Sequence, residues 1–283
     1  MKIGVLTGAD EKQKNLLDIT LPILDQYCQK HNYYLHYFTS NVDNSNQILD
    51  KSYFARYPFI KKHLPNYDWV FWIDADCLVM NFFKKLESYI DNDYSIILDK
   101  SVLSPVPCCQ SGHGFFKNNK FSINLLNEIL NFSFKAKPGY ADNEIINDIF
   151  LNLYTKSPFV YHNHIKLLGP GKNRIGHYDK EIIEFLIFNQ QGNPEGEFDL
   201  YPKNGLCTFD DIYTHGKDFL YHRSGVDVLQ KRVSNKNNPK FRDFATKESD
   251  LKYHADRIIR DKIVIDPKIN PNEWFYTILD NRL

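Results

Sequence analysis

Residues 67–76 read YDWVFWIDAD, in which five apolar residues (69–73) run without interruption into Asp74-Ala75-Asp76. A continuous run of large apolar side chains is typical of a strand that is covered on both faces, as in the parallel sheets of α/β proteins. The two aspartates follow where such a strand would end. The stretch therefore predicts a central buried strand with a pair of carboxylates at its carboxyl end.

The segments around this strand alternate between strand and helix patterns. Residues 2–7 form a short apolar run, residues 11–31 have leucines near helical spacing, and residues 33–38 are a second strand candidate. Pro22 lies inside the helical pattern and predicts a kink or a break there. A further helix covers residues 53–64. This alternation predicts an α/β fold with a mostly parallel sheet.

Later elements follow a mixed pattern. The sequence predicts helices over 120–131 and 141–153, short strands over 159–161, 165–168 and 219–221, and a loop over 189–205. It shows no internal repeat and no low-complexity linker. We therefore expect one domain over residues 1–228, followed by a basic C-terminal extension over 229–283 that packs on it.

The composition excludes some classes of protein. The 283 residues contain 35 Lys plus Arg and 35 Asp plus Glu, so a protein that binds nucleic acid through net charge is not expected. No stretch approaches the roughly 20 apolar residues of a membrane span, and residues 1–6 lack the apolar region of a signal peptide. The five cysteines are scattered without a CxxC pair. These features predict a cytoplasmic protein with reduced thiols.

Asp74 and Asp76 are candidate metal ligands. Side chains at i and i+2 of an extended segment point the same way, toward the sheet edge where open α/β sheets bind ligands. Carboxylate oxygens suit Mg²⁺ or Mn²⁺, which often bridge protein carboxylates to substrate phosphates. Spacing alone is weak evidence, since about two DxD matches arise by chance in a chain of this composition. The second match, Asp91-Asn92-Asp93, lies in a polar turn and is interpreted as structural.

Residues 67–81, YDWVFWIDADCLVMN, resemble the DxD region of glycosyltransferase family 34, the galactosyl, mannosyl and xylosyl transferases. The resemblance implies a GT-A fold, a single Rossmann-like mixed sheet flanked by helices, with a nucleoside-diphosphate sugar as donor substrate and Mn²⁺ (or Mg²⁺) as cofactor. It also implies retention of anomeric configuration.

Four further segments resemble the family in the same order along the chain: 53–56 (YFAR), 111–118 (SGHGFFKN), 141–147 (ADNEIIN) and 218–225 (DFLYHRSG). In the family these segments hold a cation near the donor diphosphate, flank the sugar pocket, line the donor sugar and complete the metal shell. The chain departs from the pattern at Gln110, where the family has Asn, at Ala141, where it has an acid, and at Asn143, where it has Gln. Lys231 stands in for a Lys that often follows the last segment.

The resemblance assigns residues to three roles. The implied metal ligands are Asp74, Asp76 and His222. The implied donor-binding residues are Thr7, Gly8, Ala9, Arg56, Asp74, Gly225 and Lys231. The implied catalytic residues are Asp142, Asn143 and Gln110. Structural roles remain open for several of these: Arg56 on a solvated helix face, Asp142 as a helix N-cap, and Gly225 as a turn glycine.

Residues 229–247 concentrate positive charge, with six Lys or Arg and only Asp243 as an acid. Such a cluster fits peripheral contact with the inner face of an anionic membrane, or a lipid-linked or phosphorylated acceptor. A solvated tail is the alternative.

We therefore expect a metal-dependent glycosyltransferase that moves a hexose or pentose, with UDP-galactose as the first candidate donor, to a glycan or glycolipid. An alternative is a lipopolysaccharide galactosyl or glucosyl transferase similar to family 8. Alternatives of another class are a nucleotide-sugar hydrolase or pyrophosphorylase and a non-catalytic glycan-binding protein. A pyrophosphorylase needs a Gly-rich basic loop after the first strand, and residues 7–10 (TGAD) differ from that.

Overall fold

The computed structural model describes residues 1–39, 54–100, 109–135, 142–168, 176–178 and 220–222, together with Glu248, Leu251, Lys252, Ala255, Asp256 and Ile258. The predicted loop over 189–205 and the basic segment 229–247 lie outside these residues.

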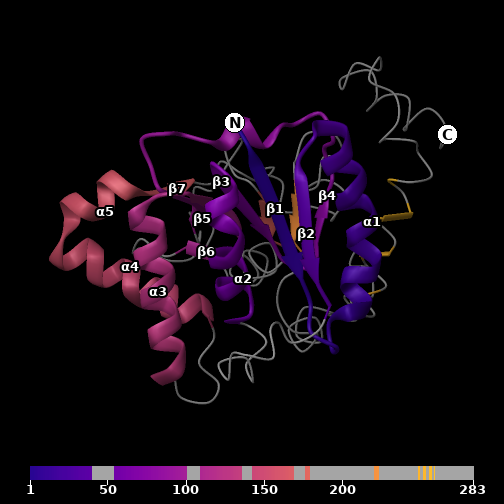
Figure 1. Cartoon of the computed structure of the whole chain (residues 1–283). Coiled ribbons are helices and arrows are strands. Elements are labelled where there is room, and N and C mark those ends of the chain that lie inside the picture. Colours follow the sequence, from indigo (N-terminus) through magenta and orange to yellow (C-terminus); the bar gives the residue numbers. More distant parts are fainter. Residues whose placement is uncertain are drawn as a thin grey trace, which may run out of the picture.

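A six-stranded mixed sheet forms the centre of the molecule (Figure 1). Its strands are β1 (Ile3–Gly8), β2 (Tyr34–Phe38), β3 (Trp69–Ile73), β5 (Ile96–Lys100), β6 (Cys109–Lys117) and β7 (Ile165–Leu168), in the order β2-β1-β3-β6-β5-β7. Strand β6 is antiparallel to its neighbours β3 and β5, whereas all other adjacent pairs are parallel. The expected α/β fold with one central mixed sheet flanked by helices is confirmed.

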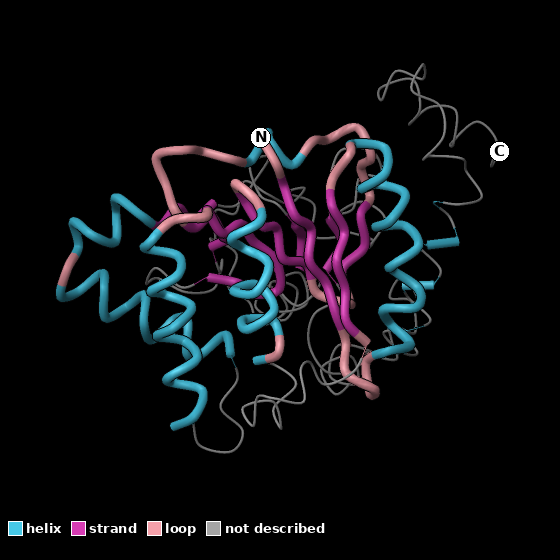
Figure 2. Tube along the Cα trace, viewed as in Figure 1, coloured by secondary structure: helices cyan, strands magenta, loops and turns pink. Residues whose placement is uncertain are grey.

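Helices cover both faces of this sheet (Figure 2). They are α1 (Lys14–His31), α2 (Arg56–His63), α3 (Lys120–Lys135), α4 (Asp142–Lys156) and α5 (Pro158–His164), with the short 3-10 helices η3 (Leu64–Asn66) and η4 (Leu86–Tyr89). Alternate residues of β3 enter two different cores. Trp69, Phe71 and Ile73 pack with α1, whereas Val70 and Trp72 pack with α2, α3 and α4. Burial on both faces explains why every position of this strand is apolar.

A second sheet of three short strands is connected to the end of β3 through the aspartate turn. This sheet was not predicted. It contains β4 (Cys77–Val79), β9 (Leu220–His222) and β8 (Gly176–Tyr178), in the order β4-β9-β8. Strand β4 follows the aspartate pair directly and pairs antiparallel with β9. Residues far apart in the sequence therefore meet next to Asp76. Near the C-terminus, Leu251, Ala255 and Ile258 are buried in the core cluster that contains α1.

Two predicted elements differ from the structure. Helix α1 is not broken at Pro22 and continues from Lys14 to His31, with both Pro22 and Asp18, four residues before it, exposed. The strand expected over Phe159–Tyr161 is wrong, since these residues belong to α5. Pro158 is the first residue of that helix, where its missing N–H costs nothing.

Candidate functional site

Strand β3 ends at Ile73, and the aspartate pair lies in a tight turn rather than in the extended segment that was expected. The turn is closed by the Cys77 N–H, which donates to the Asp74 carbonyl at 3.0 Å. Ala75 is buried against Ala9 and Leu17, and its carbonyl accepts a hydrogen bond from Thr20 Oγ1 at 2.9 Å. Asp74 and Asp76 remain partly exposed on either side of it. The buried alanine thus fixes a turn that carries two carboxylates at its surface.

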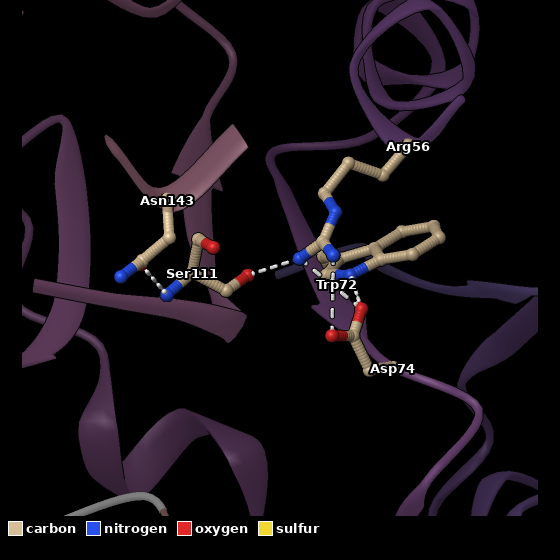
Figure 3. A network of polar contacts seen from close by, with 5 residues as sticks. All are labelled: Arg56, Trp72, Asp74, Ser111 and Asn143. Carbon is tan, nitrogen blue, oxygen red and sulfur yellow. Dashed lines mark hydrogen bonds and ion pairs between the residues drawn. The ribbon is translucent and has the colours of Figure 1, made fainter. Parts of the chain in front are cut away.

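The Asp74 carboxylate is braced from two directions (Figure 3). Trp72 Nε1 donates to Oδ1 at 2.7 Å, and Arg56 Nη2 donates to Oδ2 at 3.2 Å. Arg56 Nη1 lies 3.1 Å from Oδ1, and the guanidinium carbon lies 5.5 Å from the centre of the Trp72 ring. The side chains of Arg56 and Asp74 are only 12% and 20% exposed. Charge-assisted bonds of this kind hold the carboxylate in one orientation.

A chain of contacts continues from Arg56 to α4. Arg56 Nη1 donates to the Ser111 carbonyl at 2.6 Å, and the Ser111 N–H donates to Asn143 Oδ1 at 3.0 Å (Figure 3). One turn further along α4, Asn147 Oδ1 accepts from the Cys109 N–H at 2.7 Å. Gln110 lies between these two tethered residues of β6. The structure therefore brings four predicted site residues, Arg56, Asp74, Gln110 and Asn143, into one neighbourhood.

The end of β1 lies beside the aspartate turn through the contact between Ala9 and Ala75. Thr7 is 1% exposed, and the Ala9 N–H donates to the Phe38 carbonyl at 3.1 Å. At Gly8, an added Cβ would lie 2.3 Å from the Phe38 ring, so a larger residue would have to displace this ring. The strand end predicted to border the donor is thus a closely packed backbone edge next to the two carboxylates.

Other predicted site residues are described only in part. His222 is the register partner of Cys77 in the pairing of β4 with β9, which places its backbone beside the residue that follows Asp76. Helix α4 begins at Asp142. The side chains of His222 and Asp142, and all of Gly225 and Lys231, lie outside the described residues.

Sequence reasoning missed the hydrogen bonds and the ion pair that hold the Asp74 carboxylate. Trp72 was expected only as a core residue, and the Asn143/Asn147 pair at helical i, i+4 spacing was not interpreted as a tether, although that spacing places both amides on one helix face. It also missed a buried pair, in which His113 Nε2 and Asp99 Oδ2 lie 3.0 Å apart with both side chains fully buried. His113 is the register partner of Ile73, the residue before Asp74.

The chemistry of the turn favours a hard cation. The two carboxylates offer oxygen atoms of the type that Mg²⁺ and Mn²⁺ prefer. Burial raises the pKa of the neighbouring Cys77 thiol well above its usual value. No group of three or more His, Cys, Asp or Glu side chains that could hold a metal occurs within the described residues. Asp74 and Asp76 therefore fit a metal as a pair of ligands. A third protein ligand would have to come from outside the described side chains.

The family model described as "Protein of unknown function, DUF273" matches residues 24–166, half of the chain. The chain belongs to this family. The matched range contains α2, β3, the aspartate turn, β6, α4 and α5, and so most of the site described above. No curated protein matches the DUF273 chain significantly.

Solved structures resemble this DUF273 protein over nearly its whole length. One is a glycosyltransferase involved in glycosylation of the major capsid of PBCV-1, with 14% identity, 90% of this chain and 99% of that chain covered, and a TM-score of 0.53. Another is the bifunctional glycosyltransferase WbbM, with 14% identity, 89% of this chain covered and a TM-score of 0.50. The DUF273 chain spans 51% of WbbM. These matches show that the fold is one found in glycosyltransferases; they do not single out family 34.

One further finding concerns membranes. Among the described helices, none has both the length and the apolar character needed to cross a bilayer.

Proposed function

We propose that this DUF273 protein is a glycosyltransferase that moves a sugar from a nucleoside-diphosphate sugar to a glycan or glycolipid acceptor. The observation that carries the proposal is the braced Asp74–Asp76 turn at the carboxyl end of β3, in a fold found in glycosyltransferases. Ligands of open α/β sheets bind outside the carboxyl ends of the strands, which is where this turn lies.

Asp74 and Asp76 would hold Mn²⁺ or Mg²⁺, with His222 as the third ligand. When bound, such an ion neutralises the negative charge of the departing nucleoside diphosphate. The register of β9 against β4 supports this ligand set, because it places the His222 backbone next to the turn.

The donor would lie along the edge formed by Thr7, Gly8 and Ala9, with its base and ribose against closely packed backbone. Arg56 would position Asp74, to which it is already bonded, and a direct contact with the diphosphate is the further role that we propose for it. Gly225 and Lys231, which follow β9 in the sequence, would contact the phosphates. UDP-galactose is the donor that we propose first, with retention of configuration.

The sugar would be oriented by α4 and β6. The Asn143 amide accepts from the Ser111 N–H through Oδ1, which fixes the side chain and directs its Nδ2 group, a donor for a sugar hydroxyl. Asp142 precedes it at the start of α4, and Gln110 is the neighbour of Ser111. These three residues are our candidates for contact with the reacting sugar.

Thermal unfolding with added nucleotides tests the proposal. We expect UDP, or one other nucleoside diphosphate, to raise the Tm only when Mn²⁺ is present. Asp76→Asn should lose this stabilisation, whereas Asp93→Asn, which changes an exposed acid of the second DxD turn, should keep it. If no nucleotide stabilises the parent chain with or without metal, the proposal is wrong.

Turnover separates a transferase from the alternatives. The parent should release UDP from UDP-galactose faster when glycan or glycolipid acceptors are added, and should form a glycosidic bond whose anomeric configuration NMR can assign. Donor cleavage to free sugar that acceptors never divert would identify a hydrolase instead.

A further inference from the structure

The end of α4 and the start of α5 carry a group of exposed apolar side chains. Leu151, Tyr154, Phe159 and Val160 are 39%, 41%, 78% and 37% exposed. Phe159 is the most exposed large hydrophobic residue that the structure describes. Figure 1 shows α5 at the margin of the molecule, beyond the edge strand β7. We call this surface, residues 151–160, the α4–α5 tip.

The tip is anchored by a buried neighbour. Tyr161 is 4% exposed, and its ring packs edge-on against Phe150 and Tyr154 with centroid distances of 6.1 and 5.4 Å. The Ser157 N–H donates to the Leu153 carbonyl at 2.8 Å, which ties the connection between the helices. Because Tyr161 holds α5 against α4, Phe159 and Val160 are presented to solvent by a folded element and cannot turn inward without breaking that contact.

Lys156 is the only charged residue in the sequence of the tip, residues 151–160. Residues 149–168 contain no Asp or Glu, and exposed Lys156 lies within the tip between Tyr154 and Phe159. The other lysine of this stretch, Lys166, pairs with Asp91 at 2.6 Å away from the tip. Asp148, the nearest acid along α4, precedes Lys156 by two turns, about 12 Å.

We propose that the α4–α5 tip docks on an anionic lipid bilayer, with Phe159 and Val160 inserted among the acyl chains and Lys156 at the headgroups. Phe and aliphatic side chains enter the boundary between headgroups and acyl chains, Tyr lies at the interface, and Lys is attracted by anionic lipids. A second copy of the chain fits less well, since four partly exposed side chains fall short of the about 800 Å² per partner of a stable interface.

The geometry relates this surface to the candidate site. Helix α4 begins in the site, where Asn143 contacts Ser111, and ends at Lys156 in the tip. These residues are thirteen positions apart, about 20 Å along the helix axis. A docked tip would therefore hold the site within about 20 Å of the lipid surface, within reach of a membrane-bound acceptor head group. The docking itself does not rest on the proposed function.

Vesicle sedimentation of the full chain tests the inference. We expect the parent to pellet with vesicles of phosphatidylcholine containing about 30% phosphatidylserine, and to bind pure phosphatidylcholine more weakly. Phe159→Ser combined with Val160→Ser should weaken binding roughly tenfold or more, and Lys156→Glu several-fold. Tyr37→Ser, which removes an aromatic residue that is 53% exposed on β2 at the opposite edge of the sheet, should bind like the parent. Unchanged thermal unfolding checks that each variant is folded.

Three outcomes would overturn the inference. The first is that the parent fails to bind anionic vesicles. The second is that the tip variants bind as well as the parent, while neutral substitutions at the six basic residues of 229–247 abolish binding. The third is that light scattering shows a dimer that the tip variants lose while their vesicle binding persists. None of these measurements uses nucleotide or turnover, so their failure would leave the proposed function untouched.

Discussion

Arg56 places both terminal nitrogens of its guanidinium on the Asp74 carboxylate, with Nη2 donating to Oδ2 at 3.2 Å and Nη1 lying 3.1 Å from Oδ1. The same Nη1 donates to the Ser111 carbonyl at 2.6 Å. One side chain at the start of α2 therefore joins the end of β3 to β6. Because a guanidinium is planar and bidentate, this contact sets the direction of the carboxylate as well as its charge.

Removal of this guanidinium should weaken both the fold and the site. In Arg56→Ala, the partly buried Asp74 loses its cation and the Ser111 carbonyl loses a donor, so we expect the free energy of unfolding to fall by about 1–3 kcal/mol. The Mn²⁺-dependent stabilisation by nucleotide should fall with it. Urea denaturation and thermal unfolding measure the two effects.

Two variants make the test specific. Arg56→Lys keeps the positive charge but loses the planar, bidentate guanidinium, so it should recover only part of the lost stability. Lys14→Ala removes an exposed pair with Asp18 and should leave the urea midpoint unchanged. If Arg56→Ala behaves like Lys14→Ala, the contact between Arg56 and Asp74 has no structural role.

The amide tethers between α4 and β6 should contribute separately. Asn147→Ala removes the two hydrogen bonds that this amide makes to the Cys109 N–H and carbonyl, and we expect a loss of about 1–3 kcal/mol in the free energy of unfolding. Asn143→Ala should cost less stability, because it removes one bond to Ser111, but should reduce sugar transfer more. Asn152→Ala, at an exposed position of α4, is the matched control. Equal effects of all three substitutions on urea denaturation would contradict the assignment.

The central strand could be predicted because its burial leaves a local pattern. Trp69 and Phe71 face one core while Val70 and Trp72 face the other, so both faces demand apolar residues and the run is continuous. The aspartates that follow it were placed correctly at the strand end for the same reason.

The remaining features depend on contacts that no local pattern records. The aspartate turn forms because Ala75 packs on Ala9 and Leu17. The Asp99–His113 pair depends on the register of β5 against β6, which shifts between Leu98 and Asp99. The segment 159–161 has the composition of a strand, yet it is helical because Tyr161 packs against α4 and Pro158 suits a helix start.

The pairing of β5 with β6 leaves no room for a side chain at Gly114, which is the register partner of Leu98. An added Cβ would lie 2.1 Å from Leu98 Cδ2 and 3.0 Å from the Ile97 carbonyl oxygen. Since overpacking forces side chains off their rotamers or moves backbone, Gly114→Ala should lower the free energy of unfolding by about 1–3 kcal/mol in urea denaturation. In the double variant with Leu98→Ala, the added methyl should cost much less than it does alone, because the clashing atom is absent. Additive effects would show that the backbone, not Leu98, limits the space.

A pair of stacked histidines, one on β2 and one at the end of α2, should make the stability depend on pH. The rings of His36 and His63 stack with their centroids 4.2 Å apart, and Phe59 packs edge-on against His63. Burial lowers the pKa of His63 to about 4, and repulsion from His36 and Lys62 acts in the same direction. Burial also lowers the pKa of His36, whose Nε2 contacts the Tyr67 hydroxyl.

The sign of the effect follows from proton binding. A histidine in the unfolded chain titrates near 6.5, so between about pH 6.5 and pH 4 the unfolded state binds more protons than the folded state. The contribution of His63 is therefore complete above about pH 6.5 and is lost as the pH falls toward 4. We expect the Tm to fall over this range in the parent and to fall less in His63→Phe, which keeps an aromatic ring against His36 and cannot take up a proton. His162→Gln, at an exposed histidine of α5, is the control for the substitution itself. A Tm profile of His63→Phe that parallels the parent from pH 7 to pH 4 would mean that other groups govern the acid sensitivity.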